Sequence, residues 1–161
     1  MNIIPYDYFP PSSPGLDSLS LNTHPFIGSH DSAANDASKH LFTTHLPFVE
    51  TQTHNFLGQY NFGVRWFDLR VQKTIIGDDI TFKHGPILLQ DMIDDTSFWN
   101  MLNTAVSEQQ IVLLDFNHYP YSEKESIMNK FNEYLSNTGL SSNAHRISDP
   151  SGFNLSLRSY K

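Results

Sequence analysis

The sequence predicts a single α/β domain with a mostly parallel sheet, and three observations lead to this fold class. Predicted strands and helices follow one another in the order strand, helix, strand, strand, helix, strand, helix, which is typical of α/β domains. Polar clusters follow several predicted strands, where α/β barrels and open sheets place their ligand-binding residues. The length of 161 residues fits one domain of ordinary size.

The composition excludes several classes of function. Lys and Arg total 10 against 17 Asp and Glu, giving a formal net charge of -7, so we expect no nucleic-acid partner. The chain has no Cys, which excludes disulfides, thiolate metal ligands and a Cys nucleophile. Hydrophobic residues make up 39% and aromatic residues 13%, which is enough to build a core.

The start of the chain predicts neither a targeting segment nor a membrane span. Residues 1–22 are rich in Pro and Ser, which predicts an irregular lead-in and a domain over residues 23–161. The N-terminus has no basic start followed by an apolar stretch. No run approaches the roughly 18 apolar residues that a membrane span needs. We therefore expect a cytoplasmic or membrane-peripheral protein, with the compartment left open.

The first part of the predicted domain contains a strand, a polar loop and a helix. A buried strand is predicted over Pro25–Gly28, and the polar loop Ser29–Ser32 follows it. Helical spacing of apolar residues predicts a helix over Val49–Phe62, with Thr51 as N-cap and Gly63 just past its end.

The next segment, Gly63–Gln72, predicts a strand with two different faces, because side chains alternate along a strand. Its charged face holds Trp66, Asp68 and Arg70, and its apolar face holds Phe67, Leu69 and Val71. A second strand, Ile80–Phe82, runs into the turn Lys83–Pro86. The connection is too short for the crossover of about a dozen residues that parallel neighbours need. It is therefore either a hairpin or an irregular crossover.

The second half of the chain predicts two helices around one strand. Apolar spacing predicts a helix over Asp95–Glu108. The continuous apolar run Ile111–Phe116 predicts a strand covered on both faces. Ser122 and Glu125 form a capping box for a further helix that stops at Gly139. The pattern is irregular after Leu140, and only Phe153–Leu157 indicates another strand.

The candidate site residues lie at the ends of predicted strands. His30 with Asp31, Asp68 with Arg70, and His84 are expected to converge on one rim, because carboxyl ends of parallel strands meet there. Two structural alternatives stay open. The loop Ser29–Ser32 is also typical of a helix cap or an Asx turn, and Asp68 with Arg70 of a salt bridge on a solvated strand. We expect the remaining histidines to be surface or structural residues: His24, His40, His45, His54, His118 and His145.

These residue types suit phosphodiester cleavage. Two histidines can act as general base and general acid near neutral pH. A guanidinium presents forked donors to phosphate oxygens, and a carboxylate can orient it or an imidazole. The alternative is a metal site built from His30, Asp31, Asp68 and His84. Because Arg70 would repel a cation there, we favour a site without a metal or other cofactor.

The order and spacing of these motifs resemble the X region of phosphatidylinositol-specific phospholipase C. The resemblance is closest to the bacterial enzymes and the eukaryotic X-domain-only proteins, and it runs from about His24 to Leu135. The segments that carry it are Pro25–Ser32, Thr51–Gln52, Gly63–Arg70 and Lys83–Pro86. The resemblance implies a distorted TIM-type (β/α) barrel, of which this chain contains the N-terminal half.

The resemblance also implies residue roles in cleaving phosphatidylinositol-type lipids. His30 would be the general base that deprotonates the inositol 2-hydroxyl, and His84 the general acid that protonates the departing diacylglycerol. Arg70 would neutralise the phosphoryl oxygens in place of calcium, and Asp31 and Asp68 would position Arg70 and His84. In a second step the two histidines would exchange roles to hydrolyse the cyclic product.

Asn117 stands at the substrate-binding position where bacterial relatives carry Lys. The family's aspartate that orients the base histidine comes from a late strand, which this chain does not supply. Such barrels run to about 250 residues, so we expect open sheet edges that favour self-association, pairing with a complementary half, or aggregation. Expected partners are a phosphoinositide lipid and, transiently, a membrane surface.

Two other functions fit the same residues. One is a metal-dependent glycerophosphodiesterase or sphingomyelinase-like hydrolase, although that pattern has a carboxylate where this chain has Arg70. The other is a non-catalytic lipid- or protein-binding relative. Loss of activity in EDTA, restored by Mg²⁺ or Ca²⁺, would identify the first of these.

Overall fold

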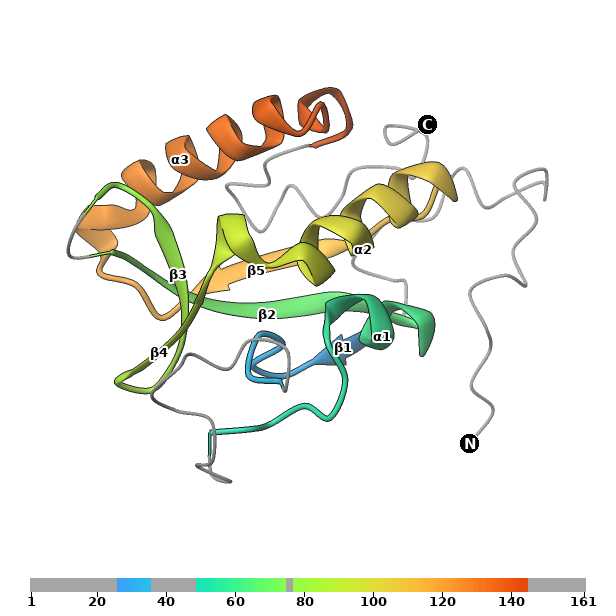
Figure 1. The fold of residues 1–161 in the computed structure, drawn as a ribbon, viewed down its shortest axis with the longest axis horizontal. Coiled ribbons are helices and arrows are strands. Elements are labelled where there is room, and N and C mark those ends of the chain that lie inside the picture. The colour runs from blue at the N-terminus through green and yellow to red at the C-terminus, as the bar shows by residue number, and fades with distance from the viewer. Residues whose placement is uncertain (1–25, 36–48, 75–76, 145–161) are drawn as a thin grey trace.

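One long strand, β2 (Val64–Lys73), lies at the centre of the sheet (Figure 1). β1 (Ile27–Ser29) and β5 (Leu113–Asn117) pair with it in parallel. The end of β2 pairs antiparallel with β3 (Ile80–His84), which in turn pairs antiparallel with β4 (Ile87–Asp91). The sheet therefore has a parallel part and an antiparallel extension, and β2 belongs to both.

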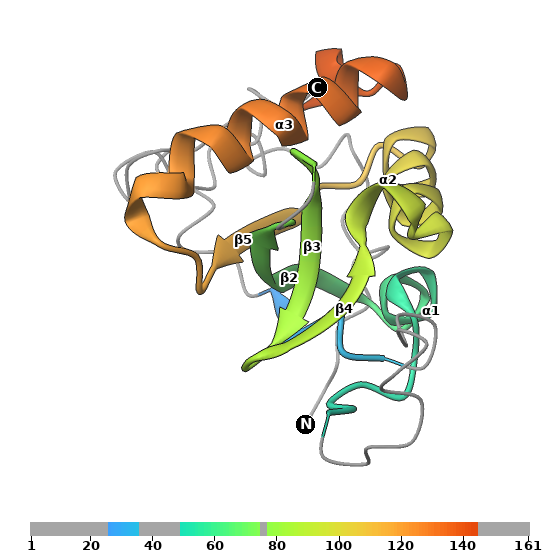
Figure 2. The same ribbon diagram turned by 60° about the vertical axis from the view of Figure 1, so that its left-hand side comes forward.

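This is a computed structural model, and it describes residues 26–35, 49–74 and 77–144. Its helices are α1 (Phe56–Asn61), α2 (Thr96–Ser107) and α3 (Lys124–Asn137). Short 3₁₀ turns occur at Met92–Asp94, Tyr121–Glu123 and Ser141–Asn143. α1 packs beside α2, and α3 lies across the end of the β3 hairpin (Figure 2). None of the described helices has the length and apolar character needed to cross a bilayer.

The prediction of a mostly parallel sheet is wrong in part. β3 and β4 both pair antiparallel, so the short connection after β2 is a hairpin, closed by the Thr74 amide donating to the Asp79 carbonyl at 3.0 Å. The strand β4 was not predicted. Its apolar residues directly follow the turn at Gly85, where φ is 57°, so the chain reverses and continues the hairpin.

The two predicted faces of β2 are confirmed. Phe67, Leu69 and Val71 are completely buried. Asp68 and Arg70 are only partly buried, and Trp66 is 37% exposed. The strand therefore separates an apolar core on one side from a polar surface on the other, as its alternating sequence requires.

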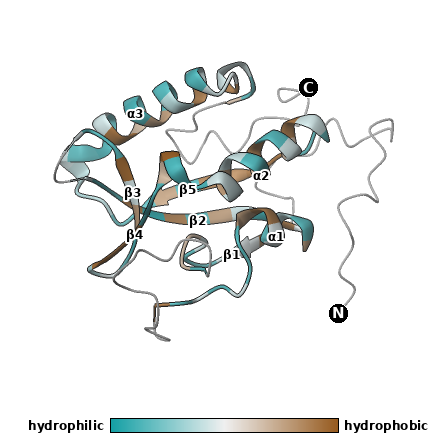
Figure 3. Ribbon diagram, in the orientation of Figure 1, coloured by the Kyte–Doolittle hydropathy of each residue, from teal (hydrophilic) through white to brown (hydrophobic). Residues whose placement is uncertain are grey.

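The core on the apolar side of β2 is built around packed aromatic rings. The Phe56 ring of α1 lies 6.0 Å from Phe67, 5.4 Å from Phe82 and 5.1 Å from Phe98. These distances are typical of tilted and edge-to-face aromatic pairs. Figure 3 shows the hydrophobic residues of β2 and β5 beneath the helices. The core thus joins the parallel part of the sheet to β3 and α2.

Two predicted helix starts are wrong. α1 begins at Phe56 because Asn55 is its N-cap and accepts a hydrogen bond from the Gly58 amide at 2.9 Å, whereas Thr51 lies outside the helix. α3 begins at Lys124, after a 3₁₀ turn, and its N-cap residue Glu123 makes no side-chain cap with any described residue. The predicted Ser122 capping box therefore does not start α3.

The remaining helix boundaries agree with the sequence. Asp95 caps α2 by accepting from the Phe98 amide at 3.0 Å. Gly63 follows α1 with φ of 93°, and Gly139 follows α3 with φ of 75°. These positive φ values are the reason that glycine ends both helices.

The predicted burial of the two outer parallel strands is wrong. Ile27 of β1 is 43% exposed. In β5, the Phe116 ring packs 4.9 Å from Phe131 of α3, but Asp115 points to the other face and is exposed. Helices cover only one face of these strands within the described residues. The predicted lead-in over 1–22 and the strand predicted over Phe153–Leu157 lie outside the described residues.

Candidate active site

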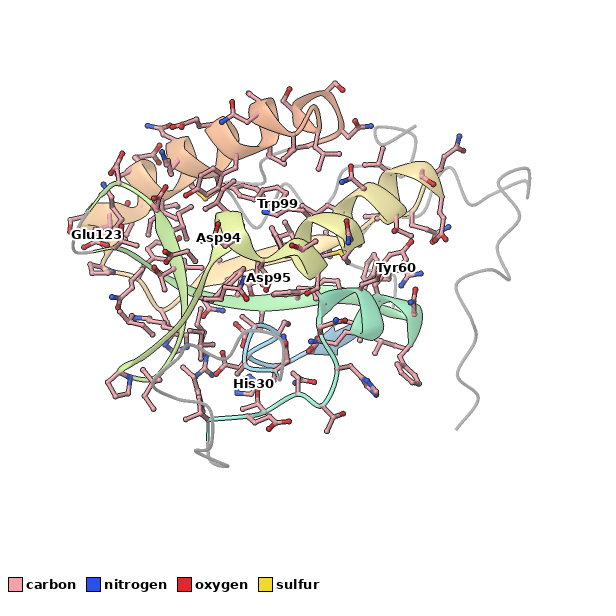
Figure 4. The ribbon with its side chains drawn as sticks, viewed as in Figure 1. His30, Tyr60, Asp94, Asp95, Trp99 and Glu123 are labelled. Carbon is pink, nitrogen blue, oxygen red and sulfur yellow. The ribbon has the colours of Figure 1, made fainter. Side chains whose placement is uncertain are left out.

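The candidate site lies where the loop after β1 meets the polar face of β2. Figure 4 shows His30 on one side of β2 and Trp99 on the other, between α2 and α3. His30 and Asp31 follow the last residue of β1, and Asp68 and Arg70 lie on β2. The site is thus separated from the aromatic core by the thickness of one strand.

Asp68 accepts hydrogen bonds from two directions. Its Oδ2 lies 3.0 Å from Nδ1 of His30 and also accepts from the Asp31 amide at 3.0 Å. Its Oδ1 accepts from the side-chain amide of Asn117 on β5. The Ser32 amide donates to the Asp68 carbonyl at 2.9 Å, which fastens the loop to β2. Asp68 therefore connects the loop, β2 and β5.

Arg70 lies between His30 and Asp31 of the loop and contacts both side chains. One terminal nitrogen is 3.1 Å from Oδ2 of Asp31, and the other is 3.0 Å from Nε2 of His30. Its Nε is 3.9 Å from Oδ2 of Asp68, a longer contact. The predicted ion pair of Asp68 with Arg70 is thus the weakest of the three, and the Arg70 side chain is largely buried rather than solvated.

Asp31 is the most buried charged residue of the site. Its side chain is completely buried, and its Oδ2 contacts Nε2 of His84 at 3.3 Å as well as Arg70. Burial raises the pKa of Asp31, against the opposing effect of the positive charges of Arg70 and His84. The backbone of Asp31 has φ of 50°, a conformation that Asp tolerates better than most residues.

His84 reaches the site by a route that the sequence did not predict. The expectation was that carboxyl ends of parallel strands would bring it there, but β3 is antiparallel to β2. β2 extends beyond Arg70 and turns back through the hairpin, so the last residue of β3 returns to the level of the site. The structure therefore brings His30, Asp31, Asp68, Arg70 and His84 together, with Asn117 beside them.

A set of polar residues outside the predicted site holds the loop in place. Gln59 of α1 accepts from the Ser29 hydroxyl at 2.5 Å and donates to the Ser32 carbonyl at 2.8 Å. Gln52 donates to the His30 carbonyl at 2.6 Å, and Thr51 donates to the Asp31 carbonyl at 3.1 Å. The signal that the sequence offered for Gln59 was a Gln among the apolar residues of a predicted helix; in the structure this side chain is buried, and buried polar groups need hydrogen-bond partners.

The loop has features of the structural alternative as well. The Ser32 hydroxyl donates to the Ser29 carbonyl at 2.9 Å, and the Ala34 amide donates to the Asp31 carbonyl at 2.9 Å. The loop is therefore a hydrogen-bonded turn, not the start of a helix, and the turn directs the His30 side chain outward, where it is 69% exposed.

The other histidines lie apart from these contacts or outside the described residues. His54 stacks on Phe62 with ring centroids 4.6 Å apart, and His118 is exposed with φ of 57°. His24, His40, His45 and His145 are outside the described residues. Within residues 26–35, 49–74 and 77–144, no group of three or more His, Asp or Glu side chains is arranged to hold a metal ion.

Comparison with known proteins gives a result at the level of structure. No protein-family model matches the chain, and no curated protein sequence matches it significantly. Its structure is similar to that of the phosphatidylinositol-specific phospholipase C of Staphylococcus aureus, from work on modulation of that enzyme's membrane binding. The two share 22% sequence identity with a TM-score of 0.63 over 90% of this chain and 47% of that chain.

The chain has the fold of the phosphatidylinositol-specific phospholipases C. A variant of the same Staphylococcus aureus enzyme has 24% identity and a TM-score of 0.58, with 90% of this chain and 47% of that chain covered. The chain spans about half the length of these phospholipase C structures. The predicted fold class, a partial and distorted TIM-type barrel, is confirmed by this similarity.

Proposed function

We propose that this protein cleaves the phosphodiester bond of phosphatidylinositol-type lipids with two histidines and an arginine, without calcium. The observation that carries the proposal is the position of Arg70. Its guanidinium contacts His30 on one side. On the other side it contacts the Asp31 carboxylate, which also contacts His84. A phosphate placed against this guanidinium would have an imidazole on each side. The phospholipase C fold supports this choice of chemistry.

In this proposal His30 is the general base. Its Nδ1 faces Asp68, so the nitrogen available for a substrate proton is Nε2, which contacts Arg70 in the structure. An inositol 2-hydroxyl would replace Arg70 as the donor to Nε2, and its oxygen would then attack phosphorus. The proton passes to Nε2 as the new oxygen–phosphorus bond forms.

Arg70 then supplies positive charge where the reaction develops negative charge. Released from Nε2 of His30, one end of the guanidinium can donate to a phosphoryl oxygen while the other end keeps its 3.1 Å contact with Asp31. A guanidinium holds several N–H donors in one plane, so it can donate to a phosphate oxygen and to a carboxylate at the same time. We assign to Arg70 the stabilisation of negative charge that a calcium ion would otherwise provide.

His84 is the general acid in this scheme. Its Nε2 faces the buried Asp31 carboxylate at 3.3 Å, which leaves Nδ1 to protonate the departing diacylglycerol oxygen as its bond to phosphorus breaks. The products are diacylglycerol and a cyclic inositol phosphate. In a second step water would open the cyclic product, with the two imidazoles exchanging roles.

Asn117 borders the proposed headgroup position from β5. It is in register with Arg70 and donates to Asp68, so it lies next to both the arginine and the carboxylate of the His30 pair. We propose that it contributes to headgroup binding from this position. A lipid substrate further requires transient binding to a membrane surface. Membrane binding has been described for the Staphylococcus aureus phospholipase C.

We also propose that the open side of the partial barrel mediates self-association. β5 pairs only with β2 among the described residues, and Asp115 and most of its neighbours on β5 are incompletely buried. An uncovered strand edge offers unpaired backbone donors and acceptors to another chain. Elution of the pure protein as a monomer in size-exclusion chromatography would contradict this part of the proposal.

The function is tested by assaying the full chain on phosphatidylinositol vesicles, with phosphatidylcholine vesicles as a control. We expect phosphorus NMR to detect a cyclic inositol phosphate, with unchanged turnover in EDTA. His30→Ala and His84→Ala should each lower turnover by about 10²–10⁴-fold, the usual contribution of a general acid or base. His54→Ala, which lies outside the site, should retain the parent's turnover.

Three results would overturn the proposal. Parent-like turnover in both His30→Ala and His84→Ala would show that the acid and base are assigned wrongly. Loss of turnover in EDTA, restored by Mg²⁺ or Ca²⁺, would identify a metal-dependent hydrolase. Binding of phosphatidylinositol vesicles with no product would identify a non-catalytic lipid-binding protein.

A further inference from the structure

Asp68 accepts hydrogen bonds from both the loop after β1 and the neighbouring strand β5. Its Oδ2 faces the Asp31 amide and Nδ1 of His30, and its Oδ1 faces the side-chain amide of Asn117. The backbone amide can only donate, the Asn117 side chain donates through its NH₂ group in this orientation, and an ionised carboxylate accepts at both oxygens. An Asn at this position could satisfy the same neighbours only if the Asn117 amide turned to present its own oxygen to the new NH₂ group.

Arg70 imposes a matching condition on the opposite edge of the His30 ring. Its terminal nitrogen lies 3.0 Å from Nε2, and a guanidinium has no acceptor. Nε2 must therefore carry a lone pair in this arrangement, and the ring proton of neutral His30 must be on Nδ1, toward Asp68. Two neighbours, one accepting and one donating, thus select one of the two neutral tautomers of the ring.

This contact differs from the role that the resemblance implies for Asp68. That role was to position Arg70 and His84, with a late strand supplying the aspartate of the base histidine. In the structure, Oδ2 of Asp68 is 3.0 Å from His30 but 3.9 Å from Nε of Arg70. Among the described residues, the carboxylate that contacts His30 therefore comes from β2 itself.

We propose that Asp68 is the positioning residue of His30: it holds the proton on Nδ1 and so directs the lone pair of Nε2 toward the substrate. This inference rests on the proposed function, because Nε2 is the nitrogen that accepts the substrate proton there. Asn117 supports Asp68 from β5 by occupying the carboxylate oxygen that does not face the loop. Asp68 itself need not touch the substrate.

The first test is spectroscopic and needs no turnover. Imidazole ¹⁵N shifts of the full-length parent protein, at a pH where the ring is neutral, should show His30 protonated on Nδ1. His118, which is exposed, provides a reference ring in the same spectrum. A neutral His30 protonated mainly on Nε2 in the parent would overturn the inference, whatever the protein's activity.

The second test removes the acceptor at position 68 and then restores it. Asp68→Ala should move the His30 proton toward Nε2 and lower kcat by about 10²–10⁴-fold, since second-shell and wrong-tautomer changes have effects of this size. Asp68→Asn keeps an oxygen that can accept from Nδ1 while its NH₂ group donates to a turned Asn117 amide. It should therefore recover the Nδ1 tautomer and part of the lost kcat.

Asp94→Asn is the matched control, because Asp94 is exposed on a 3₁₀ turn and accepts from the Gln90 side chain through its backbone carbonyl. It should change neither the tautomer nor kcat. A folded Asp68→Ala variant that keeps the parent's tautomer would overturn the inference, as would an Asp68→Asn variant with no recovery of the tautomer. Parent protein with the expected tautomer but no turnover would instead overturn the proposed function alone.

Discussion

The two faces of β2 use the same backbone for different purposes. Phe67, Leu69 and Val71 have no exposed surface and contact the core that the helices cover. Asp68 and Arg70, which alternate with them, contact a loop that lies nearly forty positions earlier in the chain. One face is determined by local alternation, and the other by contacts with distant residues.

The comparison shows where precision is needed in this fold. An apolar face tolerates small shifts, because dispersion contacts are many and individually weak. The polar face depends on a few directional contacts near 3 Å, so a displacement of one strand would break several of them. The rigid core behind β2 therefore holds the opposite face in register.

The largest predicted effect is on activity, from Arg70→Lys. A lysine keeps the charge but cannot contact His30 and Asp31 at the same time. We expect turnover on phosphatidylinositol vesicles to fall by about 10³-fold or more, as for other arginines that stabilise phosphoryl transfer. Thermal unfolding should remain close to that of the parent. Turnover reduced by less than about tenfold would show that a point charge is sufficient.

A substitution at Leu69, the residue before Arg70, tests the apolar face of β2. Leu69→Ala removes a completely buried side chain, and we expect it to lower the free energy of unfolding by about 2–5 kcal/mol. The matched variant Leu114→Ala, at a half-buried position of β5, should cost less. Urea unfolding measures both. Equal losses would mean that Leu114 is buried as deeply in solution as Leu69.

The sequence predicted the apolar face of β2 more completely than the polar one. A period of two is a local pattern, so the burial of Phe67 and Leu69 could be predicted from neighbours alone. The convergence of His30, Asp68 and His84 was predicted from strand ends, whereas the antiparallel path of β3 was only one of two alternatives. The connection after β2 is too short for an ordinary crossover, but an irregular crossover was left open beside the hairpin.

Contacts between residues far apart in the sequence could not be predicted from local sequence patterns. The bond of Asp68 with His30 depends on the register of β1 and β2, and Gln59 contacts a loop 27 positions away. The burial of β5 was overestimated because an apolar run does not show how many faces are covered. Side-chain identity indicated the chemistry of the site, while its pairings required the structure.

The pH dependence of stability distinguishes the two kinds of carboxylate. Burial raises the pKa of Asp31 above 3.8, so the folded protein holds this proton more tightly than the unfolded chain. The contribution of Asp31 to stability is therefore largest in acid and declines as the pH rises through the raised pKa. In Asp31→Asn this decline is absent, so the variant should gain stability relative to the parent as the pH rises.

Asp78 provides the control of opposite sign. Its hydrogen bond with Lys73 lowers the pKa of this exposed carboxyl, so its contribution is present at higher pH and is lost as the pH falls. Asp78→Asn should therefore lose stability relative to the parent as the pH rises. Urea unfolding across about pH 3 to 7 measures both variants. Slopes of the same sign would contradict the burial of Asp31.

The smallest predicted effect concerns the start of α1, which covers the apolar face of β2. Asn55→Ala removes the side-chain oxygen that accepts from the Gly58 amide, and we expect a loss of about 1 kcal/mol in the free energy of unfolding. The Gly58 amide should also exchange faster with deuterium. Thr51→Ala should leave that amide protected, because Thr51 donates to the Asp31 carbonyl instead. Faster exchange at Gly58 in Thr51→Ala alone would place the helix start at the residue that its sequence pattern first indicated.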